Sequence, residues 1–194
     1  MLGILSAGMV ITSGWAAEGV VTQEIDSAHS SISFSIRHFY TQVKGGFDKV
    51  SGEIQFNKEK PEESSVKVRI DVASINTGVD KRDEHLRSAD FFEVEKYPEM
   101  TFVSTKVEKT GDKTGKIHGD LTLHGVTKPV VLDVEFLGSG PDGKGNVRNG
   151  WTGTTTLKRS DFGITYNQVV EELSVIGDDV EVTLDLSTLS TSDS

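Results

Sequence analysis

Histidine has the broadest chemistry of the residues in this chain, because imidazole can bind a metal ion or transfer a proton near neutral pH. The histidines are His29, His38, His85, His118 and His124. His118 and His124 fall on one face of an expected strand, but six residues of extended chain separate them by roughly 20 Å, too far for one ion. The sequence has no HxH or HExxH spacing. We therefore expect no metal site, and we expect His118 and His124 to make surface or turn hydrogen bonds.

The patterns of catalytic nucleophiles and phosphate-binding loops are also missing. The chain has no cysteine, so it has no thiol nucleophile and no thiolate ligand. It has no GxSxG motif, and Ser160-Asp161 is a turn or cap signature before it is a catalytic pair. Gly143-Lys144-Gly145 is not followed by Ser or Thr, so we interpret it as a hairpin turn. We expect neither an enzyme nor a bound cofactor.

Four polar residues remain that could contact the head group of a ligand: His38, Arg82, His85 and Arg159. A guanidinium group suits phosphate or carbonyl oxygens. The alternative is that each residue serves its own segment. Arg82 and Asp83 would then make internal ion pairs, Arg159 would hold a loop, and a backbone carbonyl would satisfy His38. Both interpretations stay open at the level of sequence.

The elements around these residues are expected to be strands, because apolar and polar residues alternate with a period of two along most of the chain. Ile32, Phe34 and Ile36 are a clear example. We expect strands near 31–39, 42–56, 65–75, 100–109, 115–124, 129–138, 147–158 and 179–188. A short helix is expected within Val79–Glu95, and a frayed tail over Ser187–Ser194. This pattern predicts an all-β fold, an eight-stranded antiparallel barrel with a short helix near its rim.

In a barrel of this size, the inward faces surround a lumen that can hold one small ligand. The inward positions of the expected strands are apolar, and we expect them to bind the ligand. They are Ile32, Phe34, Ile36, Val66, Val68, Ile70, Phe102, Leu121, Leu123, Leu132, Val134, Phe136, Trp151, Val182 and Leu184. His38, Arg82, His85 and Arg159 are then candidates for a polar mouth.

Charge limits the classes of partner. The chain of 194 residues has 20 Lys plus Arg against 30 Asp plus Glu, a formal net charge of -10. An acidic surface repels phosphate backbones and anionic head groups, so binding to nucleic acid and peripheral binding to membranes are both disfavoured. Nothing after Gly19 is long and apolar enough to insert stably into a bilayer. The sequence is compatible with a homodimer as well as with a monomer.

The start of the chain has the composition of an export signal. Residues 1–17 contain no charged side chain and end in a small-x-small site, Gly14-Trp15-Ala16. The usual basic n-region is missing. We expect a cleaved secretory signal over 1–17, a single barrel domain over 18–194, and a soluble protein in the periplasm.

The order of several short motifs resembles that of the YceI-like family of bacterial polyisoprenoid-binding proteins. The motifs are Asp26-x-x-His29-Ser30, Ser51-Gly52-x-Ile54, Ser74-Ile75-x-Thr77, Arg82-Asp83-x-His85-Leu86-Arg87-Ser88, Tyr97-Pro98, Gly119-Asp120-Leu121-Thr122-Leu123-His124-Gly125 and Arg159-Ser160-Asp161-Phe162-Gly163. They extend over nearly the whole chain after the signal. Val169-Val170-Glu171-Glu172 stands where the resemblance implies a more glycine-rich loop.

The resemblance implies a lipocalin-like barrel that holds the tail of a long-chain isoprenoid: a quinone, a quinone precursor or a prenyl pyrophosphate. Some relatives hold other amphiphiles, such as fatty amides. Burying about ten CH₂ groups at about 0.8 kcal/mol each gives on the order of 8 kcal/mol before ordering costs, so the tail alone supports roughly micromolar binding. The other classes considered are an enzyme that acts on an amphiphile at the mouth, and an interaction module with a packed lumen.

Overall fold

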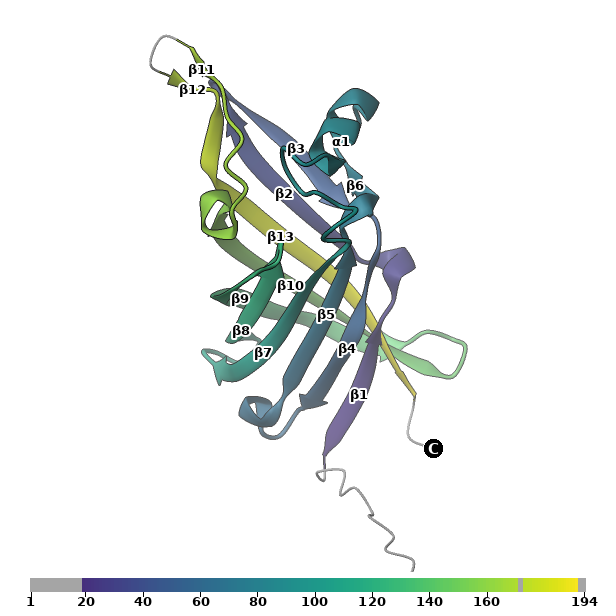
Figure 1. Ribbon diagram of the computed structural model, residues 1–194. Helices are drawn as coiled ribbons and strands as arrows, with labels where there is room; N and C mark the ends of the chain where they lie inside the picture. The colour runs from purple at the N-terminus through teal and green to yellow at the C-terminus, as the bar shows by residue number, and fades with distance from the viewer. Residues whose placement is uncertain (1–18, 171–172, 192–194) are drawn as a thin grey trace, which may run out of the picture.

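The strands of this chain form one antiparallel sheet that closes on itself (Figure 1). The computed structural model describes residues 19–170 and 173–191. The expected signal segment, 1–17, lies outside the described residues, as does the end of the expected tail, 192–194.

The strands and the helix follow one another along the chain with short connections. They are β1 (Val20–Ile25), β2 (Ser31–His38), β3 (Thr41–Phe47), β4 (Val50–Asn57), β5 (Ser65–Asp71), β6 (Ile75–Asn76), α1 (Asp80–Arg87), β7 (Glu99–Lys109), β8 (Thr114–Leu123), β9 (Val126–Pro141), β10 (Asn146–Lys158), β11 (Val169–Val170), β12 (Leu173–Ser174) and β13 (Ile176–Thr191). One-turn 3-10 helices lie at Ser27–His29, Pro61–Glu63, Val72–Ser74 and Arg159–Phe162.

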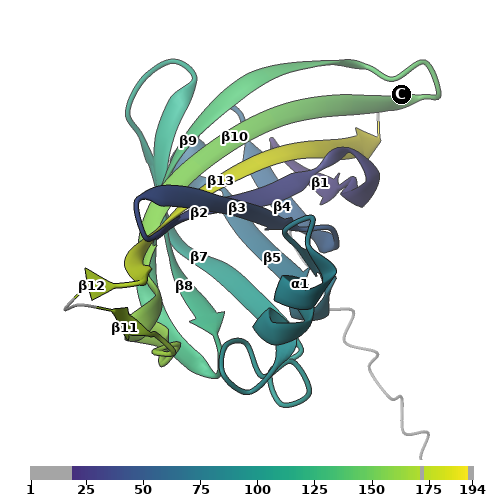
Figure 2. The ribbon, with the colours of Figure 1, turned by 90° about the horizontal axis from the view of Figure 1, so that it is seen from above.

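Eight strand positions surround the lumen. The hydrogen-bonded order is β1-β4-β5-β7-β8-β9-β10-β13, and pairing of β1 with β13, where Glu24 lies opposite Leu189, closes the ring. β2, β3 and β6 continue β1, β4 and β5 beyond short interruptions, and β2 pairs with the other part of β13. The predicted eight-stranded antiparallel barrel is confirmed, with three of its strands interrupted (Figure 2).

One interruption falls inside the expected strand 42–56, which is two strands, β3 and β4. Phe47 and Val50 are both buried although their parity differs, because Asp48 and Lys49 lie between the strands. Beyond the break, Gly52 has φ 147, and a Cβ there would overlap the carbonyl oxygen of Lys67 on β5. The close approach of β4 to β5 therefore requires glycine.

The two ends of the described chain pair with each other, which the sequence did not predict. β1 escaped prediction because its buried inward residue is polar: Gln23 accepts hydrogen bonds from Thr188 Oγ1 at 2.7 Å and from Trp151 Nε1 at 3.2 Å. The expected frayed tail over Ser187–Ser194 is wrong, since β13 continues to Thr191 and Thr188 is fully buried.

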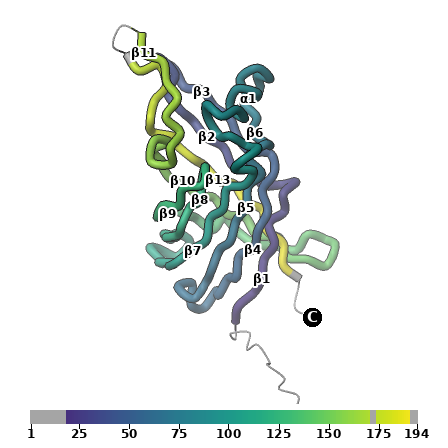
Figure 3. The backbone as a smooth tube through the Cα atoms, viewed as in Figure 1, coloured from purple at the N-terminus to yellow at the C-terminus, as the bar shows by residue number. Residues whose placement is uncertain are grey.

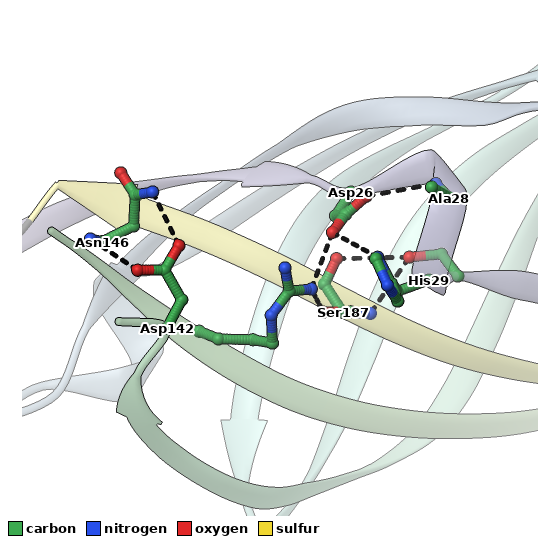
Figure 4. Close-up of polar contacts among 8 residues, drawn as sticks. Asp26, Ala28, His29, Asp142, Asn146 and Ser187 are labelled. Carbon is green, nitrogen blue, oxygen red and sulfur yellow. Dashed lines mark hydrogen bonds and ion pairs between the residues drawn. The ribbon is translucent and has the colours of Figure 1, made fainter. Parts of the chain in front are cut away.

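A polar joint connects β1 to β2 (Figure 4). The Asp26 carboxylate accepts a hydrogen bond from the Ala28 N–H at 3.1 Å and lies 2.8 Å from His29 Nδ1. Arg148 Nη1 donates to Asp26 at 2.7 Å and to Ser187 Oγ at 2.6 Å. The bond from Arg148 holds the pKa of Asp26 below its usual value. The Asp26-x-x-His29-Ser30 motif thus fastens a bend in the barrel wall.

Aromatic side chains fill the barrel at the end where β1 lies. The ring of Trp151 packs against Phe136 and Phe56, with centroids 4.7 and 5.1 Å apart. The buried pair Gln23 and Thr188 hydrogen-bonds beside them. These five side chains are named here the floor, and of them only Trp151 lines the cavity described below.

The helix α1 lies at the opposite end (Figure 1), within the segment expected to be helical. Arg87 ties it to the wall by donating to the carbonyl oxygens of Ala73 at 2.9 Å and Ile75 at 2.8 Å. Asp83 accepts a hydrogen bond from the Thr77 N–H at 2.9 Å and is buried. The helix is therefore anchored through backbone groups.

Candidate functional site

The barrel encloses an apolar cavity of about 430 Å³, a volume within the usual range for small-molecule sites. It lies above the floor and reaches the rim formed by α1 and the segment 159–168. Strands from every side of the barrel contribute to its wall, because each sends alternate side chains inward.

The strand period correctly placed the predicted apolar residues on the inner face. Those that line the cavity are Ile32, Phe34, Ile36, Val66, Val68, Ile70, Phe102, Leu121, Leu123, Leu132, Val134, Trp151, Val182 and Leu184. Phe136 was also expected to line the lumen, and this prediction needs correction. Its ring belongs to the floor, against Trp151 and Phe56. Period-two alternation gives the face of a side chain but not its depth.

Several cavity residues come from segments that sequence reasoning treated only as rim. Phe91 and Phe92 follow α1, and Phe162, Ile164 and Tyr166 precede β11. Phe91, Phe162 and Ile164 are buried. The alternation of apolar residues at 162, 164 and 166 was the signal that could have identified them. These side chains cover part of the cavity from the mouth side.

Arg82 lines the cavity and is held by Thr77. Its Nε donates to Thr77 Oγ1 at 2.7 Å, and its Nη2 donates to the Thr77 carbonyl oxygen at 2.9 Å. The acidic partner expected for it, Asp83, binds Thr77 as well. The two charged residues are thus joined through a shared neighbour.

His85 stands at the same side of the mouth. Its Nε2 lies 2.8 Å from Asp90 Oδ2, and its ring meets Phe91 and Tyr166 edge-on at centroid distances of 5.0 and 5.2 Å. It thereby connects the segment after α1 with the segment before β11. Its position at the cavity leaves the ring available to a ligand head group.

Arg159 is buried at the rim, where it also lines the cavity. It donates to the carbonyl oxygens of Gly177, Ile164 and Tyr166 at 2.8, 2.9 and 2.8 Å. Burial lowers the pKa of Arg159, and the charge of Asp178 opposes this shift. The contacts show that Arg159 organises the loop that follows it.

His38 continues the inward row of β2 to the rim, where it lines the cavity while remaining exposed. Its ring packs edge-on against Phe39 at a centroid distance of 5.1 Å. A hydrogen bond from the His38 ring to a backbone carbonyl was expected, and the contact found here is with the Phe39 ring.

The other histidines lie away from the cavity. His124 Nδ1 lies 3.1 Å from the Phe162 carbonyl oxygen, and its ring packs on Tyr97. His118 Nε2 lies 3.5 Å from Glu108. Within residues 19–170 and 173–191, no three His, Asp or Glu side chains are grouped as metal ligands.

In the part of the chain that the structure describes, no helix has the length and hydrophobicity required to cross a membrane.

A small closed antiparallel barrel with an apolar lumen and a few positioned polar groups at one mouth defines the class of ligand-binding barrels. A family model for the YceI-like domain matches residues 23–188. The chain therefore belongs to the YceI-like family, and the resemblance read from its motifs is confirmed.

Relatives cover most of the chain. The UPF0312 protein of Pseudomonas savastanoi pv. phaseolicola is 44% identical over 162 residues, 83% of this chain and 81% of the relative. The UPF0312 protein VC_A0539 of Vibrio cholerae is 43% identical over 150 residues, 77% of this chain and 78% of the relative.

Solved structures share the fold. Burkholderia cenocepacia BcnA has a TM-score of 0.76 at 26% identity, covering 84% of this chain and 98% of that one. The Campylobacter jejuni YceI protein has a TM-score of 0.65 at 35% identity, covering 79% and 87%. A polyisoprenoid binding domain from Saccharophagus degradans has a TM-score of 0.64 at 20% identity, covering 88% and 99%, and shows likeness of fold alone.

Proposed function

We propose that this protein binds the hydrophobic tail of a long-chain isoprenoid, such as a quinone, a quinone precursor or a prenyl pyrophosphate, and carries it outside the cytoplasm. The apolar cavity of about 430 Å³, open at a mouth with positioned polar groups, is the observation that supports this most strongly. Such a cavity favours a ligand with a long apolar part and a small polar end.

Two further observations support a lipid ligand. The chain belongs to the YceI-like family, and the Saccharophagus degradans domain with the same fold is a polyisoprenoid binding domain. Another amphiphile, such as a fatty amide, would satisfy the same apolar wall. The polar residues at the mouth would then select among head groups.

The proposed place of action is the periplasm, on the strength of the uncharged apolar segment 1–17. N-terminal sequencing of the mature protein tests it. We expect cleavage after Ala16 or Ala17, and a retained Met1 would contradict the proposal of a cleaved signal.

An enzyme acting at the mouth is the second candidate, because His85 and Asp90 form a histidine–carboxylate pair there. A general base needs such an orienting partner. His85 also has a structural role, because its ring packs against Tyr166 of the segment before β11. Since binding accounts for the whole cavity, we propose a carrier rather than a catalyst.

Mass spectrometry of an organic extract of the purified protein tests the proposed ligand class. We expect a prenylated lipid from the wild type and little from Leu132→Trp, which fills the cavity without adding charge. Leu137→Trp is the matched control, since Leu137 lies on the same strand but is 54% exposed. Equal lipid content in both variants, or no lipid and no uptake of a decyl-substituted benzoquinone by the wild type, would overturn the proposal.

A further inference from the structure

Two hairpins at the mouth present exposed apolar side chains. Phe39 and Tyr40, at the turn between β2 and β3, are 38% and 89% exposed, and Val169 and Val170 of β11 are 70% and 48% exposed. These four residues are named here the rim patch. None of them lines the cavity, so the apolar side chains are not explained by contact with a ligand inside the barrel.

The two halves of the rim patch lie next to each other. The Phe39 N–H donates to the Val175 carbonyl oxygen at 2.7 Å, and the Val175 N–H donates to the Gln168 carbonyl oxygen at 2.9 Å. Val169, the next residue, pairs with Ser174. Figures 1 and 2 both show the two hairpins side by side at one edge of the opening. The two hairpins that carry the rim patch are therefore neighbours at one edge of the mouth.

The backbone at Phe39 is held in an unusual conformation. Its φ is 51, in the left-handed region that bulky residues rarely adopt. The Val175 carbonyl on one side and Arg37 Nη1, which donates to the Phe39 carbonyl oxygen at 2.9 Å, fix it there. Asn or Gly would suit this backbone better. A strained aromatic residue at an exposed turn indicates a function for the ring.

The side chains of the rim patch carry no charge. Residues 38–43 and 162–170 contain no Asp, Glu, Lys or Arg, although such residues make up 26% of the chain, and Glu171 and Glu172 follow directly after Val170. The patch itself therefore suits a surface without net charge, whereas the adjoining glutamates and the net charge of -10 are repelled by an anionic one.

We propose that the rim patch docks transiently on the interface of a zwitterionic phospholipid bilayer, which places the cavity mouth where a lipid ligand can pass directly between membrane and barrel. This inference rests on the proposed function. Tyr and Phe suit the boundary between head groups and acyl chains, since one part of that environment is wet and the other apolar. The contact is with the surface and involves no spanning segment.

A second copy of this chain is the competing occupant, because exposed apolar patches also mark protein interfaces. Four side chains on two narrow hairpins are few for a stable dimer, whose interface takes about 20–30 residues from each partner. A shallow insertion of a few apolar side chains into a bilayer has no such area requirement.

Co-sedimentation with phosphatidylcholine vesicles tests the proposal. The wild type should bind, and Phe39→Asn combined with Tyr40→Ser should bind roughly tenfold more weakly or less. Asn suits the positive φ, so this variant should fold, as circular dichroism and melting will show. Leu137→Ser is the matched control, because it removes an exposed apolar side chain from the opposite end of the barrel and should bind like the wild type. Adding phosphatidylglycerol to the vesicles should weaken binding.

The proposal would be overturned if the wild type ignored the vesicles, if both variants bound equally, or if the double variant changed only the oligomeric state in sedimentation velocity. Uptake of a decyl-substituted benzoquinone from solution separates this result from the proposed function. Binding of the quinone without binding of vesicles overturns only the docking surface, whereas failure of the wild type to take up the quinone counts against the carrier itself.

Discussion

Arg82 donates two hydrogen bonds to one residue, Thr77, one to its hydroxyl oxygen at 2.7 Å and one to its carbonyl oxygen at 2.9 Å. Asp83 accepts from the N–H of the same residue at 2.9 Å. Two consecutive residues of α1 thus hold both the N–H and the carbonyl oxygen of Thr77. Arg82 and Asp83, whose charges suggested a head-group clamp, therefore attach the helix to the rim.

This arrangement predicts that Arg82→Ala lowers the melting temperature while the folded protein keeps most of its affinity for a short-tailed quinone analogue. Two hydrogen bonds from a charged donor are lost, at a cost of about 1.5–3 kcal/mol in the free energy of unfolding. Thermal melting and titration of the same sample measure the two effects separately. A weakening of binding by the same 1.5–3 kcal/mol with unchanged melting would instead assign Arg82 to the head group.

Leu132→Asp should abolish uptake of the ligand and also destabilise the barrel, because a carboxylate in the apolar cavity has no partner. The loss of binding is informative only if the variant is folded, so circular dichroism accompanies the binding assay. Leu137→Asp on the outer face of β9 is the control, and it should change neither quantity. Normal uptake by a folded Leu132→Asp protein would place the ligand outside the lumen.

Gly52→Ala should be strongly destabilising. Its φ of 147 is one that residues with a Cβ rarely adopt, and the added methyl group would overlap the Lys67 carbonyl oxygen. Gly143→Ala, at a turn with φ 76 and open space around the position, controls for the backbone term alone. Urea denaturation should place the midpoint of Gly52→Ala well below that of Gly143→Ala, and equal midpoints would contradict the close approach of β4 to β5.

Acid should weaken the fold through two carboxylates. The side chain and N–H of Asn146, together with the Lys144 N–H, lower the pKa of Asp142 to about 2 (Figure 4), and Arg148 lowers the pKa of Asp26. Each of these carboxyl groups has a lower pKa in the folded protein than the usual 3.8, so its charge stabilises the fold at pH values above 3.8. This contribution is lost as the pH falls toward the pKa of the group in the folded protein.

Melting temperatures measured between about pH 5 and pH 2 check this sign. Asp142→Asn and Asp26→Asn remove the titrating groups, so each variant should show a shallower decline than the wild type over that interval. An identical slope in all three proteins would show that other carboxylates govern the acid response.

Side-chain parity explains how much of the site was predictable. Ile32, Phe34 and Leu132 could be assigned to the lumen because the alternation of a strand is written in consecutive residues. The depth of Phe136 depends on which residues lie across the barrel, and no local pattern records that. β1 was invisible because its inward residue, Gln23, is satisfied by Thr188 from the far end of the chain.

The polar mouth was predictable by residue but not by role. Arg82, His85, Arg159 and His38 all line the cavity. The partners of the two arginines are backbone carbonyls and a hydroxyl, which every segment of a protein offers and which composition therefore cannot identify. Acidic neighbours drew attention to ion pairs that the rim does not use for either arginine.

The floor has a consequence for the order of events in the proposed transport. Since the cavity ends at Trp151, against which Phe136 and Phe56 pack, the lumen is a blind pocket rather than a conduit. The proposed ligand would leave through the opening by which it came, its tail last, and a second molecule could not displace it from behind. Loading and release would then be mutually exclusive steps, and delivery in one direction would require that the donor and the acceptor differ in their own affinity for the ligand.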